Sequence, residues 1–122
     1  MKALKPFLTG LVLVAALATS CATAYAATAG QQNAVRDARE YLGTQAFSFK
    51  GLISQLKFDG FTASQAKYGA KHVHANWNKE AAADAREYLQ TQAFSRRGLI
   101  EQLEFDGFTP AQAAHGAKAA GL

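Results

Sequence analysis

The sequence has few of the residues that build disulfides, metal sites and active sites. Its 122 residues include one cysteine, Cys21, which cannot form a disulfide within the chain. His72 and His74 are two residues apart, a spacing that points them to different faces of a helix, and no cluster of cysteines or carboxylates adds further ligands. There is no nucleophile motif and no glycine-rich phosphate loop. We therefore expect a protein that is not an enzyme and that binds no metal or cofactor.

Net charge is also small once the start of the chain is set aside. A positive formal charge, here +4, is typical of proteins that bind nucleic acid. However, Lys2 and Lys5 lie in a leader that we expect to be removed. From Ala27 onward, 11 basic residues stand against 9 acidic ones, which leaves a net charge of +2. We therefore expect no nucleic-acid partner.

Residues 1–26 have the pattern of an export signal. A basic start is followed by an apolar stretch from Phe7 to Leu17 and then by small residues. The apolar stretch is shorter than the ~20 residues of a transmembrane helix. Two cleavage sites are open. Cleavage before Cys21, at a relaxed lipobox, would lipidate that cysteine and anchor the protein to the outer face of the cytoplasmic membrane, whereas cleavage after Ala26 would release a secreted protein.

The remainder of the chain contains one motif twice. Residues 34–75 and 81–122 match at roughly two thirds of their positions, at a constant offset of 47 residues and without a gap. We expect two copies of one helical unit. Each unit is near the smallest size at which a hydrophobic core is stable alone, so we expect the units to pack against each other or against a partner. Residues 27–33 would form a tether and residues 76–80 a joint.

Apolar residues at steps of three and four predict the helices of each unit. The first helix of the first unit should begin at Ala34, and Ser48 and Thr62 should cap a second and a third helix. No stretch alternates between polar and apolar residues as a strand would. The sequence therefore predicts an all-α fold, in which the leader precedes two tandem three-helix, helix-turn-helix-like repeats.

A turn should end the second helix of each unit. Gly60 and Gly107 occupy equivalent positions after an aspartate, and glycine takes positive φ without steric cost. We expect the phenylalanines on both sides of the first turn, Phe58 and Phe61, to fold back onto the core. Trp77, the one tryptophan, lies in the joint, where it could pack between the units or complete a single core.

The two units differ most in the exposed stripe of the second helix. At spacing that places each trio on one face, the residues are Lys50, Ser54 and Lys57 in the first unit and Arg97, Glu101 and Glu104 in the second. The stripe thus changes from basic to mixed and acidic. The two stripes could face each other between the units, could bind one partner, or could simply be solvated.

The repeated phrase from Tyr41 to Thr62 and from Tyr88 to Thr109, joined through Trp77-Asn78, resembles the Ltp family of host cell surface-exposed lipoproteins. The resemblance implies tandem helix-turn-helix-like repeats outside the cytoplasmic membrane, tethered by a lipidated Cys21. Members from temperate phages act in superinfection exclusion, in which a surface lipoprotein stops a second phage from injecting DNA by engaging its tape-measure protein. The chain departs from the family in its lipobox and in the basic residues Lys50 and Lys57.

We therefore expect an exported, lipid-anchored envelope protein that binds another protein and blocks DNA injection. The alternative is a cell-surface module that binds cell-wall polymer or an envelope protein.

Overall fold

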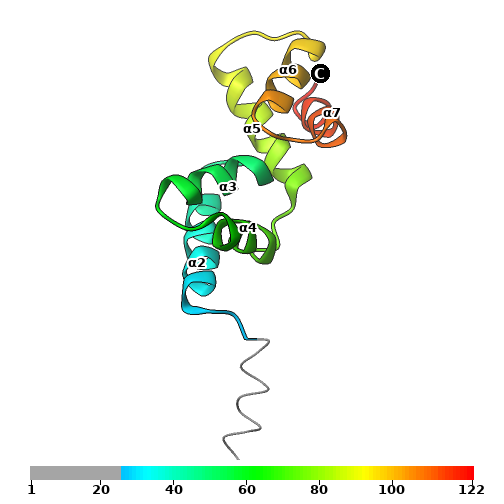
Figure 1. Ribbon diagram of the computed structural model, residues 1–122. Coiled ribbons are helices and arrows are strands. Elements are labelled where there is room, and N and C mark those ends of the chain that lie inside the picture. Colours follow the sequence, from blue (N-terminus) through cyan, green and yellow to red (C-terminus); the bar gives the residue numbers. More distant parts are fainter. Residues whose placement is uncertain (1–25) are drawn as a thin grey trace, which may run out of the picture.

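The computed structural model describes residues 26–122, so residues 1–25, with Cys21 and the cleavage site before it, lie outside the described residues. Residues 26–122 contain six helices and no strand: α2 (Ala29–Thr44), α3 (Phe49–Phe58), α4 (Ala63–His72), α5 (Trp77–Thr91), α6 (Arg96–Phe105) and α7 (Pro110–Ala119). The first three form one unit and the last three another, stacked along the long axis of the molecule (Figure 1). This arrangement confirms the predicted fold of two three-helix repeats.

The first helix begins earlier than the sequence predicts, at Ala29 instead of Ala34. The Thr28 hydroxyl accepts a hydrogen bond from the backbone N–H of Gln31, and the Gln31 side chain accepts one from the N–H of Thr28. This capping box starts a helix in a segment that has no large apolar side chain to reveal it. Most of the expected tether at residues 27–33 is therefore helical.

The expected joint at residues 76–80 is also helical beyond its first residue. The Asn76 side chain accepts a hydrogen bond from the N–H of Lys79 and caps α5, which begins at Trp77. The Trp77 ring packs against the core of the first unit and lies 5.5 Å from the Phe49 ring in an edge-to-face contact. The first residue of the second unit's leading helix thus completes the first unit's core.

The caps and turns expected inside the units are present. Ser48 caps α3 and Thr62 caps α4, while Ser95 caps α6 in the second unit. Gly60 and Gly107 both have a φ of 105°, which a side chain would strain. The backbone therefore reverses directly after α3 and α6.

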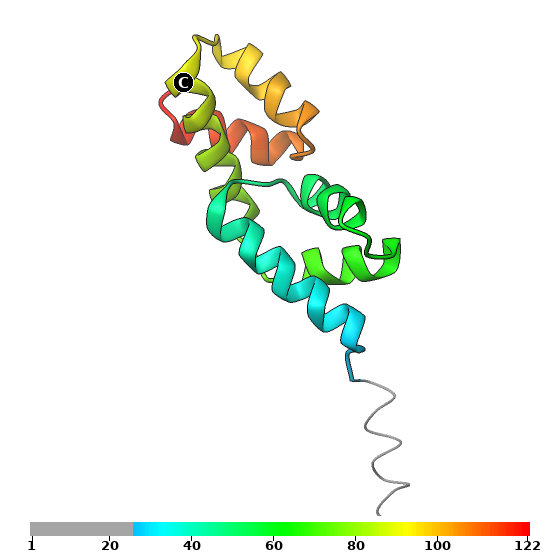
Figure 2. The ribbon, with the colours of Figure 1, turned by 90° about the vertical axis from the view of Figure 1, so that its left-hand side faces the viewer.

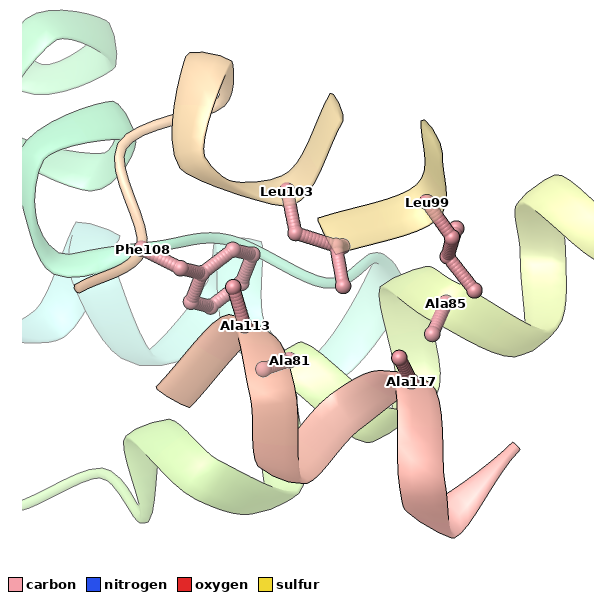
Figure 3. Close-up of a cluster of buried hydrophobic side chains, with 7 residues drawn as sticks. All are labelled: Ala81, Ala85, Leu99, Leu103, Phe108, Ala113 and Ala117. Carbon is pink, nitrogen blue, oxygen red and sulfur yellow. The ribbon is translucent and has the colours of Figure 1, made fainter. Parts of the chain in front are cut away.

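Each unit has a small core made largely of alanine and leucine. Figure 3 shows the core of the second unit, in which α6 contributes two leucines over the alanines of α5 and α7. Its buried members are Ala81, Ala85, Leu99, Leu103, Phe108, Ala113 and Ala117. Small residues let the first and third helices of each unit cross closely. In the second unit, a Cβ added at Gly116 would lie 2.7 Å from the backbone oxygen of Ala81. In the first unit, a Cβ at Gly69 would lie 2.8 Å from the backbone oxygen of Ala34.

The two units touch where the end of α6 meets the start of α3 (Figure 2). The Ser48 hydroxyl donates a hydrogen bond of 2.6 Å to the backbone oxygen of Asp106. The next residue, Gly107, fits so closely that an added Cβ would lie 2.6 Å from the Ser48 oxygen. The backbone N–H of Phe47 donates to Glu80 Oε1 across 3.2 Å. These contacts, together with Trp77, hold the units in one arrangement.

Candidate functional site

All six residues of the predicted stripes are exposed, three on α3 and three on α6. Among residues 26–122 one ion pair is present, and it lies within the second stripe, where Arg97 Nε contacts Glu101 Oε1 at 3.0 Å. The basic α3 stripe and the acidic α6 residues therefore form no ion pair with each other between the units. Their charges face outward and are available to a partner.

Each stripe continues into an exposed phenylalanine. The prediction that Phe58 folds back onto the core is wrong. Its side chain is 86% exposed, and that of its equivalent Phe105 is 84% exposed. The backbone reversal at Gly60 and Gly107 returns the following phenylalanine to the core instead, so that Phe61 packs there and Phe108 is buried. Phe58 lies eight residues after Lys50, which places it on the exposed face of α3.

The two helices that carry the stripes lie on one side of the molecule. In Figure 2, α3 and α6 lie on the same side, with α2 and α5 on the other. The hydrogen bond between Ser48 and Asp106 fixes the end of α6 against the start of α3. We call these exposed faces of α3 and α6, made of the six stripe residues with Phe58 and Phe105, the ridge.

In each unit, the same polar network joins the ridge helix, α3 or α6, to the first helix of that unit, α2 or α5. In the first unit, the Tyr41 hydroxyl donates to Asp59 Oδ2 across 2.5 Å, and the Gln55 amide donates to both Tyr41 and Asp59 at 3.2 Å. In the second unit, Tyr88 donates to Asp106 across 2.6 Å, and Gln102 donates to both at 3.1 Å. The network ties the end of the ridge helix, where the exposed phenylalanine sits, to the long first helix of the same unit.

A second carboxyl joins this network in each unit. Asp84 hydrogen-bonds to Asp106, and burial, followed by the negative charge of Asp106, raises the pKa of Asp84 to about 7. Burial and then Asp59 likewise raise the pKa of Asp37. The pKa of Tyr88 is raised to about 12, mainly by burial and then by its hydrogen bond to Asp106. Two close carboxyl groups share a proton more readily than they both ionise, so we expect the stability of the second unit to depend on pH.

The other residues singled out in the sequence have structural surroundings. Gly60 and Gly107 form the turns after the ridge helices. The His72 ring stacks on Tyr68, and His74 has a φ of 55°, in the left-handed region. No group of three or more histidine, cysteine or acidic side chains within residues 26–122 is arranged to hold a metal ion. In the same range, no helix has the length and apolar character needed to cross a bilayer.

Sequence reasoning missed the phenylalanines of the ridge and the two tyrosine–aspartate networks. The position of Phe58 was available from helical spacing, since it shares the face of Lys50 and Ser54. The networks had a weaker signal: identical tyrosine, glutamine and aspartate residues recur at the 47-residue offset, but so do the core residues. Repetition alone does not separate polar contacts from packing.

Comparison with known proteins gives a consistent result. The family described as host cell surface-exposed lipoprotein matches residues 29–73 and 76–118 of the chain. A solved structure, Ltp, a superinfection exclusion protein from the Streptococcus thermophilus temperate phage TP-J34, shares 28% sequence identity with a TM-score of 0.72. The match covers 76% of this chain and 97% of that one. No curated protein matches the chain.

The two family matches divide the chain as the helices do, with one match over α2–α4 and the other over α5–α7. They confirm the resemblance that the repeated phrase indicated. The chain belongs to the family of host cell surface-exposed lipoproteins.

Proposed function

We propose that the chain is a lipid-anchored envelope protein whose ridge binds another protein, and that this binding blocks DNA injection by a second phage. One observation carries the proposal: Phe58 and Phe105, at equivalent positions of the two units, are 86% and 84% exposed. Burying a phenylalanine side chain in a partner contributes about 1.5–3 kcal/mol. Two such side chains, each beside charged residues, have the composition of anchors at a protein interface.

The charges of the ridge indicate what the partner should carry. The α3 part of the ridge is basic, through Lys50 and Lys57, and the α6 part carries the acidic residues Glu101 and Glu104. A complementary partner has acidic groups opposite α3 and basic groups opposite α6, with an apolar pocket near each. Such complementarity sets orientation and association rate more than affinity.

The proposed biological role is supported by the similarity to a phage superinfection exclusion protein over nearly the whole of that chain. The proposed partner is a protein of the infecting phage that passes through the envelope with its DNA, for which the tape-measure protein is our candidate. Attachment through Cys21 would place the ridge at the membrane that this DNA must cross. The role requires binding and orientation, and we assign it no catalytic step.

A phage challenge tests this proposal. Cells that produce the wild-type protein should adsorb the phage normally but show reduced DNA injection compared with cells that lack the protein. The variant Glu101→Lys/Glu104→Lys should restore injection at least tenfold. Glu40→Lys/Glu87→Lys is the matched control, because it makes the same charge change at exposed positions on α2 and α5, outside the ridge.

Equal injection in cells with and without the wild-type protein would contradict the exclusion role. Retention of the purified protein on isolated cell wall, unaffected by the ridge variant, would instead favour the binding of a wall polymer.

A further inference from the structure

A shallow hollow of about 240 Å³ lies on α4, apart from the ridge residues. It is lined by Gln31, Ser64, Lys67, Tyr68, Lys71 and His72. Five of these residues lie along one face of α4 at steps of three and four, and Gln31 comes from the first turn of α2. The volume is below the ~300–1,000 Å³ of sites for drug-sized ligands and suits a small polar group.

The lining of this hollow is rich in hydrogen-bond donors. Lys67 and Lys71 are exposed, and the one ion pair within residues 26–122 involves neither of them. Nδ1 of His72 lies 3.0 Å from the backbone oxygen of Tyr68, and because a carbonyl oxygen only accepts, this nitrogen carries a proton. The His72 ring is held flat against the Tyr68 ring, with centroids 3.8 Å apart. This leaves Nε2 as an acceptor, so the attraction for an anion comes from the two ammonium groups of Lys67 and Lys71 beside the ring.

The second unit keeps the scaffold of this hollow but not its chemistry. At the 47-residue offset, the equivalent residues are Asn78, Ala111, Ala114, His115, Lys118 and Ala119. One of the two lysines is replaced by alanine, and so is the histidine that stacks on the aromatic ring. Because α7 folds and packs without these groups, the fold does not require them in α4. The packing of α4 therefore leaves Lys67 and His72 free to contact a ligand.

The hollow lies close to the proposed membrane anchor. Gln31 is ten residues after Cys21, and ten residues span at most ~35 Å when fully extended. The first turn of α2 is therefore within reach of a bilayer in which Cys21 is lipidated. Basic side chains at that distance are attracted by anionic headgroups.

We infer that this hollow binds the phosphate of an anionic phospholipid headgroup and holds the first unit against the membrane. The inference rests on the membrane location in the proposed function, but not on phage exclusion or on the ridge. Lys67 and Lys71 would supply the charge, with the side-chain NH2 of Gln31 as a further hydrogen-bond donor, while the stacked rings of Tyr68 and His72 form a wall of the hollow. Binding here would fix the direction in which the ridge points away from the bilayer.

Binding to lipid vesicles tests the inference without the lipid anchor. Residues 26–122 contain all six helices and both cores, so this part of the chain can be used without its leader. We expect at least tenfold tighter binding to vesicles containing phosphatidylglycerol than to vesicles of phosphatidylcholine alone. Lys67→Glu/Lys71→Glu should weaken binding to phosphatidylglycerol at least tenfold. The control Lys79→Glu/Lys118→Glu makes the same charge change at exposed positions outside the hollow and should weaken it less than threefold.

Three outcomes would overturn the inference. The first is equal binding to the two kinds of vesicle, and the second is an equal loss in the hollow variant and its control, which would indicate a diffuse charge effect. The third is binding of inorganic phosphate that Lys67→Glu/Lys71→Glu abolishes while binding to phosphatidylglycerol vesicles is unchanged, which would assign the site to the free anion. Circular dichroism of each variant separates loss of binding from loss of fold. Phage exclusion is measured independently, so failure of either proposal leaves the other open to its own test.

Discussion

Ser48 of the first unit and Asp106 of the second are joined by a hydrogen bond of 2.6 Å that couples the start of α3 to the end of α6. The same hydroxyl accepts a hydrogen bond from the N–H of Gly51, so one buried side chain both caps a helix and holds the neighbouring unit. Its equivalent Ser95 caps α6 in the same way but is exposed. Two residues that the duplication made identical therefore have different roles.

Replacing the two serines should separate these roles. Ser95→Ala removes a helix cap and should lower the free energy of unfolding by about 1 kcal/mol. Ser48→Ala removes the cap and also leaves the backbone oxygen of Asp106 without its donor, which should add on the order of 1 kcal/mol. Urea denaturation of both variants measures the difference. Equal losses would mean that the contact between the units adds nothing to stability.

The first and third helices of each unit cross so closely that one glycine in each unit is essential for packing. Gly69→Ala and Gly116→Ala should each destabilise the protein by about 1–3 kcal/mol, because the added methyl group would meet the backbone of Ala34 or Ala81 at under 3 Å. Gly43→Ala is the control. Gly43 is also in a helix but has no atom within 4 Å of an added Cβ, so this change should stabilise by about 0.5–1 kcal/mol. Thermal or urea unfolding that ranked the three variants otherwise would contradict the packing.

Asp84 should make stability depend on pH below neutrality. Its pKa is about 7 in the folded protein, raised mainly by burial, and near 3.8 when exposed. Below about pH 4 the group is protonated in both states. Between about pH 4 and 7 the folded protein holds a proton that the unfolded chain releases, so stability falls as the pH rises. The loss should be on the order of 1–2 kcal/mol, less than the full electrostatic value because the carboxyl group is only half-buried.

Urea denaturation across this pH range checks that expectation. The variant Asp84→Asn cannot ionise and should flatten the dependence, whereas Asp37→Asn in the first unit should have a smaller effect, because its partner Asp59 is exposed. If the wild-type protein and Asp84→Asn showed parallel pH profiles, the shared proton between Asp84 and Asp106 would be ruled out.

Much of the fold could be predicted from the sequence because its signals are local. Capping residues such as Ser48 and Thr62, and the glycines after each aspartate, act within one turn of backbone, and each occurs twice. The start of α2 at Ala29 could not be found by apolar periodicity, since Thr28 and Gln31 specify it through hydrogen bonds alone.

The ridge was predictable only in part. The exposed charges follow from helical spacing. The local sequence does not distinguish Phe58 from Phe61, but the backbone reversal at Gly60 leaves Phe58 exposed and places Phe61 against the core. The coupling between the units is not local: nothing near Ser48 or Ser95 tells which of them meets another unit. That difference arises only because the second unit follows the first.

The lipid anchor proposed at Cys21 has a direct test. The mass of the mature N-terminus from the native host should show a diacylglyceryl-modified Cys21, and Cys21→Ala should abolish both the modification and membrane retention. A plain N-terminus at Ala27 would instead show release of a secreted protein.

The measurement that tests the central claim most directly is DNA injection by an excluded phage in cells carrying Phe58→Ser/Phe105→Ser. Both side chains are exposed, so the variant should fold, be displayed and leave adsorption unchanged. We predict that injection returns to the level of cells without the protein, while Gly43→Ser/Gln90→Ser, an equivalent exposed pair on α2 and α5, continues to exclude the phage. Full exclusion by the phenylalanine variant would contradict the assignment of the ridge as the binding surface.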